Sequence, residues 1–288
     1  MTGRACGPFD LVLLDVNGTL VPSLPGSRPD AEATRRFPVL VRRLTAEGVV
    51  VGLCSDSPAE QLWEYGRRLG LGLDAASGAA PGFPVVAENG NVAADGTGTI
   101  DVVTPFPDRS VVCGEVARAA AAHGLHRTGD VTAPEFGGTE PAAGEWAFGA
   151  NRRASVSVFG PSPFVHEVRR RVPTAIARGR ADLSVEFRPD HRYAVIHPYA
   201  PVERGKRIAL ARLAVRTPQR TLVVGNSPAD WIPGVPGVRC AFVRDPAVTG
   251  EMREASWYAS EKNDLEGVVD ILENVLRHQV SPTANARV

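Results

Sequence analysis

The sequence has few cysteines and no excess of either charge. Its 4 cysteines in 288 residues are widely scattered and form no CxxC pair, so their spacing suggests neither a zinc site nor a disulfide framework. The 32 basic side chains are matched by 32 acidic ones, whereas a surface for nucleic acid or anionic membrane needs a basic excess. We therefore expect neither a nucleic-acid partner nor a membrane partner.

Long apolar runs are absent too. No stretch approaches the roughly 20 apolar residues that cross a bilayer, and residues 1–8 lack the apolar region of a signal peptide. These features predict a cytoplasmic protein. The hydrophobic fraction of 43% is ample for a core and speaks against disorder.

What is present is an alternation of short apolar runs and amphipathic segments. Strand, helix, strand, helix and strand in this order predict a parallel sheet with crossover helices, a Rossmann-like doubly wound α/β core. The expected strands are residues 11–14, 49–53, 84–87, 221–224 and 240–243, with a helix ended by Gly48, another beginning at Ser57-Pro58, and two more at 202–215 and 264–278.

The middle of the chain has a different composition. Residues 127–151 are rich in Gly, Ala, Pro and Thr and are longer than an ordinary connection. Around them the sequence predicts helices at 111–123 and 164–177 and strands at 154–159, 183–187 and 193–197. We therefore expect a core domain of residues 1–90 and 199–288, interrupted by an inserted α/β cap domain of residues 91–198.

Polar segments follow the predicted core strands. In open parallel sheets ligands bind outside the carboxyl ends of the strands. The segments are residues 15–19 (DVNGT), 54–57 (CSDS), 88–90 (ENG) and 225–230 (GNSPAD), and Lys206 lies in the helix before the last one. Carboxylates, a hydroxyl, a lysine and Gly-rich backbone are what a phosphoryl-transfer site needs.

In this order and with this insert, the segments resemble the haloacid-dehalogenase (HAD) superfamily. The insert and the ENG segment resemble its subgroup with an α/β cap (type IIB, Cof-like), which contains sugar-phosphate phosphatases. Residues 54–60, 88–90 and 225–230 are most similar to mannosyl-3-phosphoglycerate phosphatases. The resemblance covers roughly residues 9–90 and 199–275, and implies a Mg²⁺-dependent phosphatase acting on a small sugar phosphate or phosphoglycerate-type metabolite.

The resemblance also implies roles for single residues. Asp15 would attack phosphorus and form an aspartyl-phosphate, Ser55 would hydrogen-bond the phosphoryl group, and Lys206 would neutralise charge on it. The implied sets are catalytic Asp15, Asn17, Ser55 and Lys206; substrate-binding Gly18, Thr19, Ser57 and Asn89; and, for Mg²⁺, Asp15, Asn17, Asn226 and Asp230.

Two positions depart from the family pattern, which has Asp where this chain has Asn17 and Asn226. An amide cannot exchange a proton at neutral pH, and general acid–base help is typically worth about 10²–10⁴ in rate. Asn226 also removes a negative charge beside a dication. A leaving group that needs no proton, such as an acyl phosphate, tolerates Asn17.

Two further readings therefore stay open. One is a degenerate protein that binds a phosphorylated ligand or partner without hydrolysis, and the other is a repurposed enzyme with a different reaction. Simpler local roles are open as well: Asp15 can serve a turn, Asp56 or Ser57 can cap the next helix, and Glu88 can satisfy local backbone donors. The oligomeric state is not predicted.

The expected cap offers aromatic and basic side chains that could recognise a sugar or a second anion. Arg152 and Arg153, however, precede a predicted strand, where arginines are typical of a solvated sheet edge. The candidates are Trp146, Asn151, Arg152, Arg153, Arg188, His191 and Arg192.

Overall fold

Two sheets organise the computed structural model, which describes residues 8–22, 28–72, 82–103, 105–106, 109–133, 137–176, 184–188, 193–197, 205–216 and 220–280. The larger sheet has eight strands in the order β13-β12-β11-β1-β2-β3-β4-β5. Its strands from β13 to β3 are parallel neighbours, and β4 and β5 continue it antiparallel. The strands are β1 (Leu11–Leu14), β2 (Val50–Cys54), β3 (Val85–Ala87), β4 (Val92–Ala94), β5 (Ile100–Val102), β11 (Thr221–Gly225), β12 (Val238–Phe242) and β13 (Tyr258–Ala259).

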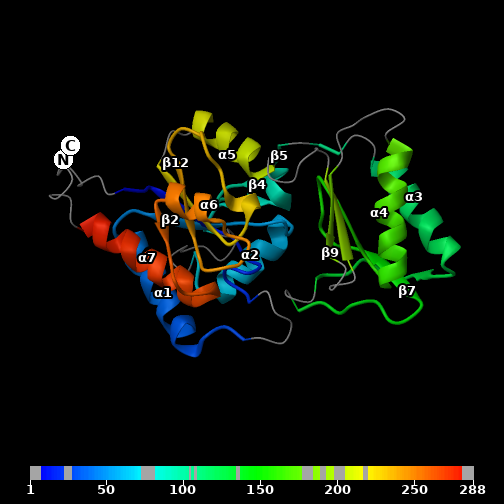
Figure 1. Cartoon of the computed structure of the whole chain (residues 1–288), viewed down its shortest axis with the longest axis horizontal. Helices are drawn as coiled ribbons and strands as arrows, with labels where there is room; N and C mark the ends of the chain where they lie inside the picture. The colour runs from blue at the N-terminus through cyan, green and yellow to red at the C-terminus, as the bar shows by residue number, and fades with distance from the viewer. Residues whose placement is uncertain are drawn as a thin grey trace.

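Helices cover both faces of this sheet. Because side chains alternate along a strand, Val12 and Leu14 of β1 join one apolar cluster and Leu11 and Leu13 join another. The first cluster packs against α1 (Ala31–Ala46), α2 (Ala59–Arg68) and α7 (Asp264–Val280), and the second against α5 (Gly205–Arg216) and α6 (Gly250–Ala255). Figure 1 shows α1 and α7 together on one side of the sheet and α5 on the other.

The smaller sheet has five strands in the order β6-β7-β8-β10-β9. They are β6 (His126–Arg127), β7 (Glu145–Phe148), β8 (Val156–Phe159), β9 (Ser184–Arg188) and β10 (Tyr193–His197). Val156, Val158 and Ile196 pack with Val112 of α3 (Arg109–Ala122) and with α4 (Ser162–Ile176), so both helices cover one face. Figure 1 shows this helical layer on the side away from the larger sheet.

The expected α/β fold with a parallel core sheet is confirmed. The short strands β4 to β7, β13 and the helix α6 had no counterpart in the sequence analysis. Strands β4 and β5 fall within residues 91–198 but belong to the larger sheet. The division into core and inserted cap stays a prediction, and sheet membership favours a start of the insert after Val102.

Two smaller expectations concern membranes and cysteines. Among the described helices, none is long and apolar enough to span a bilayer. Cys54, Cys113 and Cys240 are free thiols. Burial raises the pKa of Cys54 to about 12, so this thiol is an inert core residue.

Candidate active site

A cavity of about 320 Å³ opens at the carboxyl ends of the central strands. This is the edge where open parallel sheets bind ligands, and the volume is at the lower end for small-molecule sites. The residues that line it are Asp15, Asn17, Ser55, Asp56, Asn89, Lys206, Asn226, Ser227, Ala229 and Asp245.

Lys206 joins two buried carboxylates at the floor of this cavity. Its Nζ donates to Asp15 Oδ1 at 2.9 Å and to Asp230 Oδ1 at 2.6 Å. Burial raises the pKa of Asp15 to about 6, opposed by the charge of Lys206 and assisted by that of Asp230. Burial works against the charge of Lys206, but both carboxylates outweigh it and raise the pKa of Lys206 well above its ordinary value.

A close backbone contact positions Lys206. It is the second residue of α5, and the preceding Gly205 touches Gly90, where an added Cβ would lie 2.2 Å from the Gly205 carbonyl oxygen. Gly90 also has a φ of +93°, which favours glycine. The ENG segment therefore sets where α5 begins, and with it the place of the lysine.

Asp230 supports the loop after β11 rather than lining the cavity. Its Oδ2 accepts from the N–H groups of Asn226 and Ser227 and from the Ser227 hydroxyl, while Oδ1 accepts from Lys206. An added Cβ at Gly225 would lie 2.1 Å from the Asp230 carboxyl carbon, which explains the glycine. Both oxygens already have donors, so the expected role of Asp230 as a metal ligand does not match its geometry.

Ser55 and Asn17 present polar groups to the cavity. Ser55 is 1% exposed, and neither its hydroxyl nor the Asn17 amide makes a hydrogen bond to the described part of the chain. Unsatisfied polar groups in a concave site are suited to hold a ligand. The two residues follow β2 and β1, as the strand-end rule predicts.

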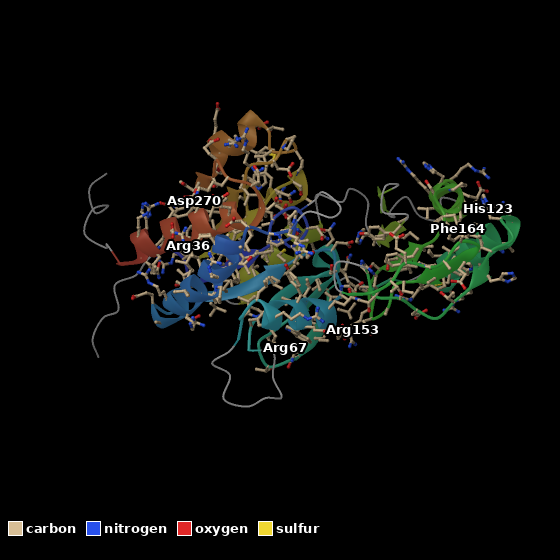
Figure 2. All side chains as sticks on the ribbon, turned by 90° about the horizontal axis from the view of Figure 1, so that it is seen from below. Arg36, Arg67, His123, Arg153, Phe164 and Asp270 are labelled. Carbon is tan, nitrogen blue, oxygen red and sulfur yellow. The ribbon has the colours of Figure 1, made fainter. Side chains whose placement is uncertain are left out.

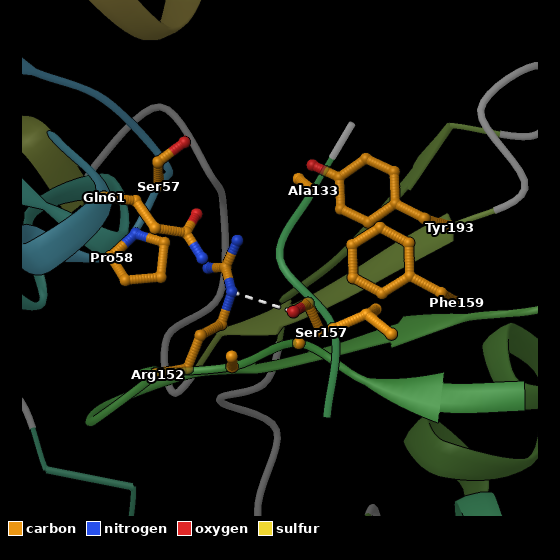
Figure 3. A pocket seen from close by; sticks show the side chains of 11 residues that line it. Ser57, Pro58, Gln61, Ala133, Arg152, Ser157, Phe159 and Tyr193 are labelled. Carbon is orange, nitrogen blue, oxygen red and sulfur yellow. Dashed lines mark hydrogen bonds between the residues drawn. The ribbon is translucent and has the colours of Figure 1, made fainter. Parts of the chain in front are cut away.

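The other expected substrate-binding residues divide between supporting and lining positions. Gly18 donates its N–H to the Val21 carbonyl at 2.7 Å, and the Thr19 hydroxyl reaches Asp15 and Asn226, so both support the loop. Asn89 lines the cavity. Ser57 lines a second, narrower pocket instead (Figure 3). The contact of these four residues with a substrate stays a prediction.

Asp245 is a cavity residue that the sequence analysis missed. It follows β12 by three residues, and its Oδ2 accepts from Asn226 Nδ2 at 3.0 Å. Residues 240–243 are a predicted strand, and ligands bind beyond the carboxyl ends of such strands. The position of Asp245 just after this strand is therefore the signal that could have found it.

Asp56 holds the two sheets together. Arg152, on the loop before β8, donates to its carboxylate at 3.1 and 3.3 Å and to its backbone carbonyl at 2.9 Å. Tyr193 of β10 donates a further hydrogen bond at 3.2 Å. The expected capping of α2 by Asp56 or Ser57 is wrong, since α2 begins after Pro58 without a side-chain cap.

Arg152 also corrects the expectation of a solvated sheet edge. Its side chain is 6% exposed, whereas that of Arg153 is 47% exposed. Burial opposes the charge, but Asp56 raises the pKa of Arg152 above its ordinary value. Figure 3 shows Arg152 reaching Ser157 beside the stacked rings of Phe159 and Tyr193.

Glu88 makes a second link between the sheets. It is fully buried and accepts from the N–H groups of Arg153 and Ala154 and from the Ser155 hydroxyl. The expectation of local donors was therefore wrong, because its donors lie 65 to 67 residues away along the chain.

The remaining candidates of the smaller sheet lie elsewhere. Trp146 is buried against Phe148 and Phe164 and belongs to the apolar core, so its expected role in recognition is wrong. Figure 2 shows Phe164 and His123 in the helical layer, far from Arg153 at the junction. Asn151 is an exposed turn residue with a φ of 61°. His191, Arg192 and the side chain of Arg188 lie outside the described residues.

The cavity offers oxygen donors for a cation. The oxygen atoms come from the Asp15 and Asp245 carboxylates and from the Asn17 and Asn226 amides, and they are of the hard type that Mg²⁺ prefers. Within the described ranges, no three Asp, Glu, His or Cys gather closely enough to hold a metal by themselves. The residues present therefore fit Mg²⁺ only as a mixed set of carboxylate and amide or carbonyl oxygens, completed by water.

Comparisons with known proteins identify the fold. No protein-family model and no curated protein matches the sequence. A crystal structure from Thermoplasma acidophilum matches with a TM-score of 0.60 at 18% identity, covering 93% of this chain and 98% of that one. A HAD subclass IIB sugar phosphatase matches with a TM-score of 0.56 at 12% identity, covering 92% and 98%.

A phosphatase of the HAD superfamily from Bacteroides thetaiotaomicron matches over 96% of this chain and 98% of its own, with a TM-score of 0.56 and 13% identity. These likenesses show a shared fold. The fold is the one shared by these proteins, which are described as phosphatases of the HAD superfamily.

Proposed function

We propose that the chain hydrolyses a small phosphorylated metabolite through an aspartyl-phosphate at Asp15. The observation that carries the proposal is the buried pair of Asp15 and Lys206, 2.9 Å apart on the floor of a cavity of about 320 Å³. Lys206 donates to Asp15 Oδ1, while Oδ2 faces no cation among the described residues and lies 3.5 Å from the Thr19 hydroxyl. One oxygen of the carboxylate is thus left to act as a nucleophile.

In the proposed reaction, an Asp15 oxygen bonds to phosphorus as the bond from phosphorus to the leaving oxygen breaks, and the leaving oxygen departs as an anion that takes any proton it needs from water. Water then hydrolyses the aspartyl-phosphate and releases inorganic phosphate. Lys206 neutralises charge on the carboxylate and phosphoryl group, and the Ser55 hydroxyl donates to a phosphoryl oxygen. Mg²⁺, held by Asp15, Asn17 and Asn226, would add further charge neutralisation.

Asn17 shapes the substrate preference of this proposal. Its amide cannot protonate the leaving oxygen, so leaving groups that need no proton are favoured. We propose that acyl and aryl phosphates react faster than sugar phosphates with the same access to the cavity. The class of substrate remains a small phosphorylated metabolite of sugar or phosphoglycerate type, in keeping with sugar phosphatases of the same fold.

Phosphate release tests the proposal. Native protein, Asp15→Asn and the surface control Asp101→Asn are assayed with Mg²⁺ on an aryl phosphate, an acyl phosphate and a panel of sugar phosphates. We expect release in the native protein and the control and none in Asp15→Asn, with a phosphoryl group on Asp15 after acid quenching. Equal release by Asp15→Asn would contradict the nucleophile.

A second candidate function is ligand binding without turnover, which the amide at Asn17 favours. In that case the native protein releases no phosphate from any substrate of the panel. Phosphorylated metabolites would still raise its melting temperature, and Lys206→Met would abolish that shift. A release rate above background that depends on Asp15 would rule this candidate out.

A further inference from the structure

The corner of the cavity formed by Asn226 and Asp245 has a fixed arrangement. Asp245 Oδ2 accepts from Asn226 Nδ2 at 3.0 Å, and Oδ1 accepts from the Ala247 N–H at 2.8 Å. Both carboxylate oxygens of Asp245 are thereby oriented, one by the backbone of its own turn and one by the amide. Asn226 itself is 8% exposed.

The hydrogen bonds also determine which way the Asn226 amide faces. The Thr19 hydroxyl donates to Asn226 Oδ1 at 3.3 Å and lies 3.5 Å from Asp15 Oδ2. The amide oxygen therefore lies on the Asp15 side and the amide nitrogen on the Asp245 side. The reversed amide would set its oxygen against the Asp245 carboxylate, and two acceptors repel each other.

The charges around the cavity point in the same direction. Lys206 offsets one of the two carboxylates it contacts, so this trio has one net negative charge. Asp56, which also lines the cavity, is paired with Arg152. Asp245 brings the total to two negative charges, which matches a divalent cation.

We propose that Asp245 and Asn226 together replace a single carboxylate at a divalent-cation site, the amide oxygen serving as ligand and Asp245 supplying the charge and the amide orientation. The inference deepens the proposed function and rests on it. Asp245 is thus a positioning residue for the cation. Outer partners of this kind typically contribute about 10–100-fold to metal affinity.

Metal binding to the full-length protein tests the inference without reference to turnover. Mn²⁺, which also takes oxygen ligands, is titrated by calorimetry and by its paramagnetic resonance signal. The variants are Asp245→Asn, the exchanged pair Asn226→Asp/Asp245→Asn, and the surface control Asp101→Asn. We expect Asp245→Asn to weaken Mn²⁺ binding about 10–100-fold, with the control unchanged.

The exchanged pair separates a cation role from a structural one. It places a carboxylate at position 226 and an amide that can donate the hydrogen bond at position 245, so we expect most of the loss of about 10–100-fold in affinity to be recovered. Native-like binding by Asp245→Asn, failure of the exchange to restore affinity, or absence of Mn²⁺ binding in the native protein would each overturn the inference. Mn²⁺ binding without phosphate release would instead contradict only the proposed function.

Discussion

Two clusters of buried charge lie close together at the same end of the larger sheet, and they are built differently. Around Lys206, two carboxylates share one cation, and polar groups of Ser55 and Asn17 lack partners within the described chain. Around Asp56 and Glu88, the carboxylate oxygens accept hydrogen bonds from the segment that leads into β8 and from Tyr193 of β10.

The number of polar groups without a protein partner distinguishes a ligand site, around Lys206, from a structural connection between the two sheets, around Asp56 and Glu88. A polar group that faces a cavity and has no protein partner is available to a ligand or to water, and Ser55 and Asn17 of the first cluster line the cavity in this way. In the second, buried charges have partners, and the result is a fixed connection between the sheets. Asp56 lines the cavity and also belongs to the connection between the sheets through its contacts with Arg152.

The largest expected effect comes from restoring an acid to the first cluster. We expect Asn17→Asp to raise the rate of phosphate release from sugar phosphates by about 10²–10⁴, because a carboxyl group can protonate the leaving oxygen. Acyl phosphates should gain much less. Steady-state assays on both substrate types measure this, with exposed Asn263→Asp as the control; equal gains for both types would contradict a role in leaving-group protonation.

Removing the shared cation is expected to cost stability as well as binding. Lys206→Met leaves Asp15 and Asp230 buried without their cation, and breaking buried pairs in this way costs about 3–5 kcal/mol. The only other lysine of the sequence, Lys262, lies at the surface, and Lys262→Met should change stability by less than about 1 kcal/mol. Urea unfolding measures both.

A second variant shows whether that cost arises from the carboxylates. Adding Asp15→Asn and Asp230→Asn to Lys206→Met removes the stranded charges, and most of the lost stability should return. If the triple variant is no more stable than Lys206→Met, the lysine acts through packing of its alkyl chain rather than through charge.

The neighbouring residues Arg152 and Arg153 allow a matched comparison of a buried and an exposed ion pair. We expect Arg152→Met to destabilise the protein by about 3 kcal/mol, because it leaves the Asp56 carboxylate buried with only weaker partners. Arg153→Met should cost less than about 1 kcal/mol, since the Arg153 pair with Glu60 is largely exposed. Urea unfolding measures the stability of both variants. Equal losses of stability would contradict the distinction between the buried Arg152 pair and the exposed Arg153 pair.

Arg152 and Arg153 also illustrate which features of the structure were predictable from the sequence and which were not. The strands that end at Leu14, Cys54 and Gly225 were predictable because each is a short apolar run followed by turn residues. The convergence of Asp15 and Ser55 was predictable from the parallel sheet, whereas the place of Lys206 beside them was implied by the resemblance to a known family. Which arginine is buried did not follow, since neighbouring side chains of one type differ only in what the fold brings opposite them.

Pairings between distant segments escaped prediction for the same reason. The contact of Asp56 with Arg152 spans 96 residues and that of Glu88 with Ser155 spans 67, and no local periodicity encodes either. Strands β4 and β5 have three residues each, too short for a hydrophobic pattern. Asp245, by contrast, was within reach of the strand-end rule.

The smallest expected effect lies at the opposite end of β1. Asp10 precedes the strand that Asp15 follows, and hydrogen bonds from Arg220 lower its pKa from 3.8. A lowered folded-state pKa contributes stability above the unfolded value, which is lost as pH falls through the folded one. Because the side chains of Asp10 and Arg220 are 45% and 41% exposed, Asp10→Asn should cost less than about 1 kcal/mol at neutral pH.

That small difference should vanish in acid, where native Asp10 becomes protonated and resembles the amide of the variant. Urea unfolding at neutral pH and at a series of acidic pH values that extends below 3.8 measures it. A loss at neutral pH as large as that of Lys206→Met would mean that exposure does not distinguish the two ends of β1. Any remaining difference in stability between the two ends of β1 would then have to come from the number of carboxylates that each cation contacts among the described residues, two for Lys206 and one for Arg220.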